Sequence, residues 1–141
     1  AASGVCRRAV AIEVEEPVVG VARSRVAGQE RSDKVIVERV APGRLPFADA
    51  SFDIVFSKDT MVHIADKETL FADLFRVLRP GGCLVASDWM ISHDGPPSED
   101  MCAYLDAEGL SFGMGSPERY RRAMGAAGFM NITLTDRNPL Y

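Results

Sequence analysis

The 141-residue sequence lacks the features that mark several classes of protein. Its three cysteines, Cys6, Cys83 and Cys102, lie far apart and form no Cys-x-x-Cys pair. Neither a disulfide framework nor a zinc site is therefore expected, and this cysteine usage suits a reducing cytoplasm. No apolar run approaches the roughly 20 residues that a membrane-spanning helix needs. The first residues do not resemble a signal peptide, so we expect a cytoplasmic protein with no membrane partner.

A concentrated basic surface is also missing. The formal net charge is −4, the sequence pI is about 5.2, and the lysines and arginines are scattered. Nucleic-acid-binding proteins usually carry a basic stripe, so no nucleic-acid partner is expected. His93 stands beside Asp94, but two side chains offer too few ligands, and we expect no metal site. The composition is 47% hydrophobic and 26% charged, which is ordinary for a globular protein, and the length predicts a single domain over residues 1–141.

Short apolar runs alternate with helical patterns along the chain. Strands are predicted over 8–14, 34–40, 52–57, 83–89 and 130–136, and helices over 16–28, 66–79 and 116–128. Pro17 and Ser116 suit helix starts, and Gly28 suits a helix end. Pro80-Gly81-Gly82 is expected to end the second helix in a turn, and the apolar strand that follows is expected to be buried on both faces. This alternation predicts an α/β fold with a mostly parallel sheet and flanking helices.

Polar side chains follow three of the predicted strands at their carboxyl ends. They are Glu13, residues 57–59 (Ser-Lys-Asp) and residues 88–89 (Asp-Trp). In open α/β sheets, ligands bind beyond the carboxyl ends of the strands. The sequence therefore predicts a ligand site at this edge of the sheet.

Three segments together resemble class I S-adenosylmethionine-dependent methyltransferases: "LPFADASFDIVFS", "VLRPGGCLVASD" and the later "AAGF". The resemblance covers about residues 8–137. It implies a Rossmann-like methyltransferase fold, S-adenosylmethionine as cofactor, no metal, and a small-molecule methyl acceptor. More narrowly, "SKDTMVHIADKETLF" and "SDW" resemble the phosphoethanolamine and related small-amine N-methyltransferases, in which Lys-Asp or Arg-Asp precedes a histidine by four positions. This narrower resemblance implies an amine as the acceptor.

The resemblance places Glu13 and Val14 in the cofactor site. Glu13 matches the acid at the end of the family's second strand, which binds both ribose hydroxyls. A carboxylate can accept two hydroxyl hydrogen bonds, so the chemistry is sound. The alternative is that Glu13 is a capping acid at the start of the following helix, beside Glu15 and Glu16.

Four further residues are expected to contact the cofactor. Ala41 stands where the family usually has an acid that accepts the adenine amino hydrogen, so this chain departs from the pattern there. The backbone at Ala41 and Pro42 is then left to flank the adenine ring. Ser57 and Lys58 are expected to contact the cofactor from the end of the strand predicted over residues 52–57. The alternative for Lys58 is simple exposure to solvent.

Asp59 and His63 are the predicted catalytic residues. In the resembled N-methyltransferases the matching Asp and His line the active site, and the His takes part in catalysis. If Asp59 begins a short helical turn, the spacing of four places His63 on the same face. An imidazole can accept the proton of a reacting amine, and a neighbouring carboxylate can orient it. The alternative is that Asp59 caps a turn and His63 packs beside Met61 and Ile64.

Asp88, Trp89 and Tyr104 are expected to contact the acceptor. Trp89 stands where the phosphobase enzymes place a tyrosine, and Tyr104 matches a second aromatic residue of their pocket. Aromatic faces attract methylated ammonium groups, although both residues suit an ordinary core as well. Glu108 and Leu110 replace the Arg and Tyr that hold the substrate phosphate in those enzymes. We therefore expect a small amine other than phosphoethanolamine, or another nucleophile, as the acceptor.

Part of the family pattern is missing. These enzymes carry a G-x-G-x-G turn before the strand that ends in Glu13, but this chain has no such motif there, and it stops short of the family's final strand. A partial domain is therefore expected, with unpaired sheet edges unless a partner, a missing segment or an oligomer fills the gap. Two other hypotheses remain. One is a truncated or degenerate domain that retains the fold for packing or partner binding. The other is a nicotinamide-dependent oxidoreductase, which the motifs disfavour.

Overall fold

The computed structural model describes residues 6–30, 32–109 and 112–137. The chain divides into two compact units, Ala1–Pro46 and Phe47–Tyr141, and each is described by itself. Each unit contains one parallel pair of strands with an intervening helix. This confirms the predicted α/β class with parallel strands and flanking helices. Among the described residues, no helix has the length and apolar character needed to cross a membrane.

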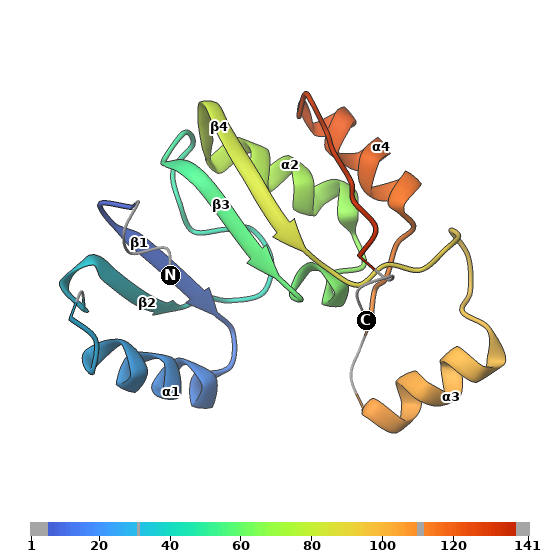
Figure 1. Ribbon diagram of the computed structural model, residues 1–141, viewed down its shortest axis with the longest axis horizontal. Helices are drawn as coiled ribbons and strands as arrows, with labels where there is room; N and C mark the ends of the chain where they lie inside the picture. Colours follow the sequence, from blue (N-terminus) through green and yellow to red (C-terminus); the bar gives the residue numbers. More distant parts are fainter. Residues whose placement is uncertain (1–5, 31, 110–111, 138–141) are drawn as a thin grey trace. The chain divides into compact units, whose positions relative to one another are not determined.

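The first unit is a strand–helix–strand motif (Figure 1). Strand β1 (Ala9–Glu13) pairs in parallel with strand β2 (Val35–Arg39). Helix α1 (Glu16–Ala27) and the 3₁₀ turn η2 (Ser32–Lys34) connect the two strands along the chain. Pro17 lies in the first turn of α1, where its missing N–H costs nothing, and Gly28 follows the last turn. Val19 of α1 and Val37 of β2 are buried, so the helix covers one face of this strand pair.

The second unit carries the larger core. Strands β3 (Phe52–Lys58) and β4 (Leu78–Ser87) are joined by the 3₁₀ turn η3 (Met61–His63) and helix α2 (Lys67–Val77). Helix α3 (Glu99–Glu108) follows, and helix α4 (Pro117–Ala127) packs beside α2 (Figure 1). The buried apolar side chains of this unit are Met61, Val62, Phe71, Leu74, Val77, Leu78, Tyr120, Ala123 and Met124. The core therefore lies between α2 and α4 and beneath the turn η3.

The predicted Pro-Gly-Gly turn exists, but as a bulge inside strand β4. The helix ends at Val77 and the strand begins at once. Phe52 pairs with Leu78 and Ile54 with Cys83, so five residue steps on β4 match two on β3. A Cβ at position 82 would lie 2.9 Å from the carbonyl oxygen of Asp53, closer than side chains tolerate. The bulge therefore requires glycine at this close approach.

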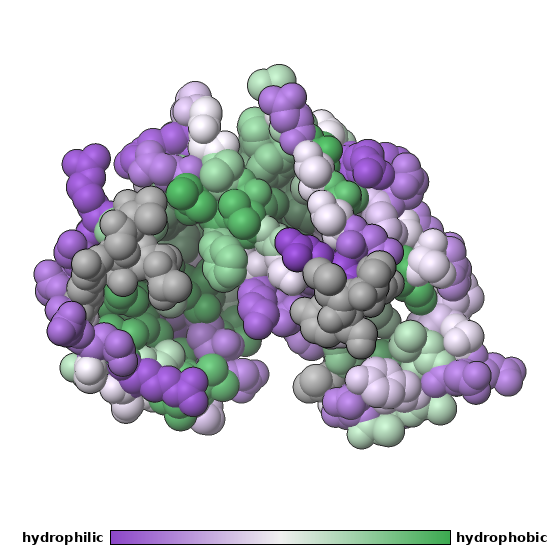
Figure 2. All heavy atoms as spheres, viewed as in Figure 1, coloured by the Kyte–Doolittle hydropathy of each residue, from purple (hydrophilic) through white to green (hydrophobic). Residues whose placement is uncertain are grey.

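The prediction that β4 is buried on both faces is wrong. Ile54, Phe56 and Val85 are exposed, with 71% of Phe56 and 50% of Val85 accessible. Figure 2 shows hydrophobic atoms gathered over β3 and β4 on the face in view. Val55 and Leu84, which point to the opposite face, are half-buried. The reason is that helices of this unit cover only one face of a two-stranded sheet.

Two further elements differ from the sequence-based expectation. Residues 130–136 form no strand, because no neighbouring strand of the described chain supplies the ladder hydrogen bonds. Helix α3 was not predicted from the sequence. Its ends did carry signals: Ser98 accepts a hydrogen bond from the Met101 N–H, and Gly109 ends the helix with φ +64°.

Candidate active site

The first unit brings two pairs of predicted cofactor residues to one edge. Strands β1 and β2 are parallel, and the Val40 N–H donates to the Glu13 carbonyl oxygen at 2.9 Å. Glu13 and Val14 therefore lie beside the loop that begins with Ala41 and Pro42. This juxtaposition is what a nucleoside spanning two adjacent strand ends would need.

The Glu13 carboxylate is engaged by the backbone that follows it. Its Oε1 accepts hydrogen bonds from the N–H groups of Val14, at 2.6 Å, and Glu15, at 3.0 Å. Both bonds fix the carboxylate at the entry to α1, as the capping alternative describes. They end on a single oxygen, and a carboxylate has about four acceptor positions. Ribose binding by Glu13 stays a prediction.

The second unit likewise gathers its predicted residues at one edge. Lys58 pairs with Ser87, and the Asp59 N–H donates to the Ser87 carbonyl oxygen at 2.8 Å. Residues 57–59 and 88–89 therefore follow adjacent strands at the same end of the sheet. Ser57 is half-buried there. The Lys58 side chain is exposed to solvent, which agrees with the alternative interpretation of this residue.

Asp59 precedes the helical turn instead of beginning it. Its φ is +51°, a left-handed conformation that aspartate tolerates better than most residues, and Thr60 occupies the N-cap of η3. The Asp59 carboxylate lies 4.0 Å from the Lys58 ammonium, and both side chains are open to solvent, so this ion pair contributes little to stability. His63 ends the turn, with its ring 5.0 Å from that of Phe112. Asp59 and His63 thus flank one turn at the sheet edge.

Asp88 is held inside the unit by two distant partners. Its Oδ1 accepts a hydrogen bond from the Val62 N–H at 3.1 Å, and its Oδ2 accepts one from the Tyr120 hydroxyl at 2.6 Å. Tyr120 is buried, and burial together with the hydrogen bond to Asp88 raises the pKa of its hydroxyl. Asp88 therefore has a structural role that the sequence did not reveal, and its contact with an acceptor stays a prediction.

Lys67 is a second residue that the sequence did not single out. Its side chain is 0% exposed, and its Nζ donates to the carbonyl oxygens of Met61 and Ile64, each at 2.6 Å. The Nζ also lies 5.1 Å from the centre of the Tyr120 ring. Burial lowers the pKa of Lys67 to about 8. A lysine in the first turn of an amphipathic helix is usually exposed, so no sequence signal marked it.

The predicted acceptor-contacting aromatics are both exposed. Trp89 is 56% accessible and Tyr104 is 57% accessible, so neither is the ordinary core aromatic of the alternative interpretation. Tyr104 lies on α3, and the charge and hydrogen bonding of Glu108, one turn later, raise the pKa of its hydroxyl. Glu108 and Leu110 were the reason to expect an acceptor other than phosphoethanolamine, and Leu110 lies outside the described residues.

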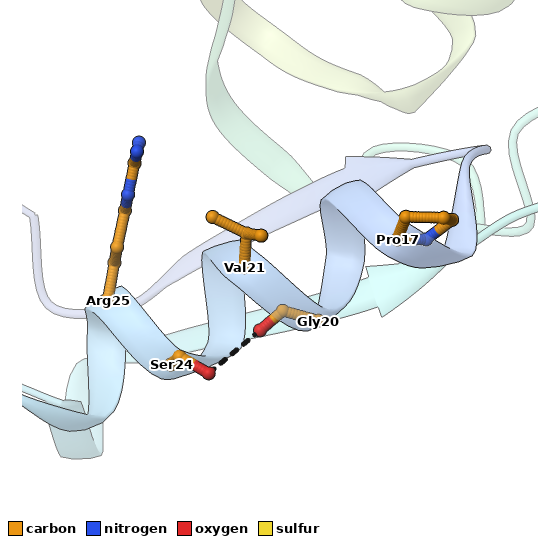
Figure 3. Close-up of a pocket in the computed structure, with 5 residues that line it drawn as sticks. All are labelled: Pro17, Gly20, Val21, Ser24 and Arg25. Atoms are coloured by element: carbon orange, nitrogen blue, oxygen red, sulfur yellow. Dashed lines mark hydrogen bonds between the residues drawn. The ribbon is translucent and has the colours of Figure 1, made fainter.

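Two other features lie apart from the predicted residues. A shallow hollow on the outer side of α1 is lined by Pro17, Gly20, Val21, Ser24 and Arg25 (Figure 3). None of the predicted site residues contributes to it. The ring nitrogens of His93 lie 3.2 Å from the Ser92 hydroxyl and 3.3 Å from the Pro96 carbonyl oxygen. Within the part of the chain that the structure describes, no group of three potential metal ligands occurs.

The sequence profile of a known family, described as a methyltransferase domain, matches residues 1–86. The chain belongs to this methyltransferase family. Membership confirms the resemblance that the strand-end motifs indicated, and the solved structures to which the chain is similar confirm the Rossmann-like fold.

Relatives of this methyltransferase domain act on different classes of acceptor. The sequence is 37% identical over 95 residues to phosphoethanolamine N-methyltransferase of Triticum aestivum, covering 67% of this chain and 18% of that protein. It is 34% identical over 125 residues to O-methyltransferase cnsE of Penicillium expansum, covering 89% of this chain and 45% of that protein. The chain therefore spans less than half the length of these curated relatives.

A solved methyltransferase structure matches almost the whole chain. It is Haemonchus contortus phosphoethanolamine N-methyltransferase 2 in complex with phosphomonomethylethanolamine and S-adenosylhomocysteine. The TM-score is 0.85 at 25% sequence identity, over 99% of this chain and 32% of that one. The methyltransferase domain described here thus corresponds to about a third of that enzyme.

Proposed function

We propose that this domain serves S-adenosylmethionine-dependent methyl transfer to a small amine. The observation that carries the proposal is the edge of the second unit, where Asp59 and the turn bearing His63 follow β3 and residues 88–89 follow β4. Amine N-methyltransferases recur among the relatives, for phosphoethanolamine and for glycine, sarcosine and dimethylglycine. An O-methyltransferase also occurs among them, so the amine is the finer part of the proposal.

Each unit by itself offers groups that suit part of the proposed cofactor. The Glu13 carboxylate suits the two ribose hydroxyls, and the exposed backbone at Ala41 and Pro42 suits the face of an adenine ring. Ser57 and Lys58 offer a hydroxyl and an ammonium group at the end of β3. When bound, the cofactor supplies an electrophilic methyl group on a sulfonium sulfur.

The chain's own residues would bind and deprotonate the acceptor. The exposed Asp59 carboxylate draws a cationic amine toward the edge, and the exposed indole of Trp89 offers a face for a methylated ammonium group. His63 accepts the proton that the amine nitrogen releases. Orientation of the amine accounts for most of the remaining acceleration. On α3, Glu108 presents an acid beside Tyr104, which favours an acceptor without a phosphate.

The second candidate is a domain that keeps the fold without catalysis and serves packing or partner binding. Two observations favour it. Ala41 supplies no carboxylate for an adenine amino group, and Oε1 of Glu13 is already engaged by the backbone N–H groups of Val14 and Glu15.

Calorimetric titration with S-adenosylmethionine and S-adenosylhomocysteine, followed by a methyl-transfer assay on a panel of small amines, tests the proposal. In a version of the protein that binds cofactor, His63→Ala should lower kcat about 100-fold or more while the cofactor Kd stays within about twofold. The control is His93→Ala, which removes the other histidine of the chain and should leave kcat unchanged.

Two results would contradict the proposal. Equal turnover by His63→Ala rules out the role of His63 as proton acceptor. Absence of cofactor binding, both by this chain and by a version extended at its N-terminus with a glycine-rich segment, rules out the enzyme and supports the second candidate.

A further inference from the structure

The turn that carries His63 is held weakly by its own hydrogen bonds. Turn η3 spans Met61–His63, and the local bonds run from the His63 N–H to the Thr60 carbonyl, at 3.2 Å, and from the Ile64 N–H to the Met61 carbonyl, at 3.0 Å. A 3₁₀ turn of this length has poor hydrogen-bond geometry and little stability of its own. Its conformation must therefore be fixed by groups outside the turn.

Those outside groups bond backbone atoms of Met61, Val62 and Ile64, on both sides of His63. Lys67 Nζ donates to the carbonyl oxygens of Met61 and Ile64, on either side of the histidine. The Asp88 carboxylate accepts from the Val62 N–H, and the Gly113 N–H donates to the Val62 carbonyl oxygen at 2.7 Å. The backbone bearing His63 is thus fixed by bonds to α2, to the residue after β4, and to the segment before α4.

A single buried network joins these partners. The Tyr120 hydroxyl of α4 donates to Asp88, and the Tyr120 ring lies beneath the Lys67 ammonium. The negative charge of Asp88 compensates the fully buried ammonium, and among the described residues no buried side-chain nitrogen or oxygen atom lacks a hydrogen-bond partner. Satisfied buried networks of this kind specify one conformation, whereas partly satisfied ones are costly.

The same geometry argues against a direct chemical role for Lys67. Its side chain is 0% exposed, and two of its three donors end on the carbonyls of the turn. An acceptor at the sheet edge has no path to an amine enclosed in this way. Lys67 can affect the reaction through the turn it holds, and not by touching the substrate.

We propose that Lys67, Asp88 and Tyr120 are positioning residues, which fix the Met61–Ile64 backbone so that the His63 imidazole is held at the ligand edge of the sheet. The catalytic part of this inference rests on the proposed function. The conformational part does not, because it concerns the position of His63 with no ligand bound.

Histidine ring signals in NMR spectra of the unliganded protein test the conformational part. The chain has two histidines, so His63→Ala assigns both sets of signals, and His93 serves as an internal reference. Tyr120→Phe removes the hydroxyl that anchors Asp88 and keeps the ring beneath Lys67. We expect the His63 ring signals to shift or broaden in Tyr120→Phe while those of His93 stay unchanged.

A matched variant separates positioning from general stability. Ala123→Gly weakens the same helix at a buried site that makes no hydrogen bond to the turn. It should lower the melting temperature and leave the His63 signals in place. The proposal is overturned if Tyr120→Phe lowers the melting temperature with unchanged His63 signals, or if Ala123→Gly moves those signals equally.

A measurement on the unaltered protein covers the case in which Tyr120→Phe does not fold. The Val62 amide, bonded to Asp88, should exchange with solvent as slowly as the core amides of α2. Unprotected exchange of this amide overturns the proposal.

Kinetics then connect the network to the reaction. Tyr120→Phe should lower kcat about tenfold with KM and the cofactor Kd within about twofold of the unaltered protein. Unchanged kcat in Tyr120→Phe, in a protein whose turnover depends on His63, overturns the catalytic part. Absence of turnover both in this chain and in the version extended at its N-terminus, with the NMR response as expected, refutes the proposed function and leaves the positioning of the turn established.

Discussion

Glu13 and Asp88 are carboxylates at the ends of parallel strands, yet their partners differ. Glu13 bonds the N–H groups of the two residues that follow it. Asp88 bonds Val62, 26 residues earlier, and Tyr120, 32 residues later. The first carboxylate shapes the entry to one helix, and the second connects three segments of its unit.

The different partners of Glu13 and Asp88 mean that an acid at a strand end has no fixed role. A carboxylate that bonds only its neighbours can be removed at little cost to the fold, and it can exchange those bonds for a ligand. A carboxylate enclosed by distant donors is part of the fold, because its loss leaves several buried groups without partners.

The largest loss of stability is expected for Asp88→Ala. It leaves the Val62 N–H and the buried Tyr120 hydroxyl without an acceptor and removes the compensating charge near Lys67. We expect the free energy of unfolding to fall by about 3 kcal/mol, measured by urea denaturation and circular dichroism. The control is Asp53→Ala, which breaks an exposed ion pair with Arg79 and should cost less than about 1 kcal/mol. Equal losses in the two variants would remove the distinction between enclosed and exposed carboxylates.

A smaller effect is expected for Lys67, and it depends on pH. Burial lowers the pKa of Lys67 to about 8 from 10.5, Asp88 and Glu68 oppose that shift, and Arg119 adds to it. Between these two pKa values the unfolded chain holds a proton that the folded protein has released. The contribution of Lys67 therefore makes stability rise with pH in this window, by up to about 1.4 kcal/mol per pH unit, and leaves it flat below pH 8.

Lys67→Met tests this pH dependence. The free energy of unfolding of the unaltered protein minus that of Lys67→Met should increase from pH 8 to pH 9.5 in urea titrations. The upper limit avoids the region above pH 10, where the raised pKa of Tyr120 lowers stability as pH increases. If this difference in unfolding free energy does not change with pH, Lys67 does not lose its proton on folding between pH 8 and pH 9.5.

The smallest loss of stability is expected for Glu13→Ala. Its bonds are local and the helix entry is partly open to water, so the unfolding free energy should fall by about 1 kcal/mol or less. If Glu13 binds the ribose, the same change should weaken binding of S-adenosylmethionine about tenfold or more, measured by calorimetry. Glu15→Ala is the matched control, because Glu15 caps α1 without a side-chain hydrogen bond. Unchanged cofactor affinity in Glu13→Ala would support capping as the only role of Glu13.

Much of the fold was predictable because its signals are local. Alternating apolar runs located β1, β2 and β3, and Pro17, Ser116 and the glycine after α4 located helix ends. The strand-end residues followed from the strands, since parallel neighbours present their carboxyl ends at one edge. The predicted strand over residues 130–136 failed because a strand depends on a pairing partner, which no local pattern supplies.

Sequence patterns alone indicated most of the strands and helices, the family, and the residues that follow the strands at their carboxyl ends. Those properties depend on residue spacing and on motifs that can be read within a few residues. Tertiary structure decided that Lys67 is enclosed, that Tyr120 reaches Asp88, and that one face of the β3–β4 pair is uncovered. Burial and polar pairing depend on which distant segments meet, and the buried network around the His63 turn exists only because α2, α4 and the end of β4 converge there.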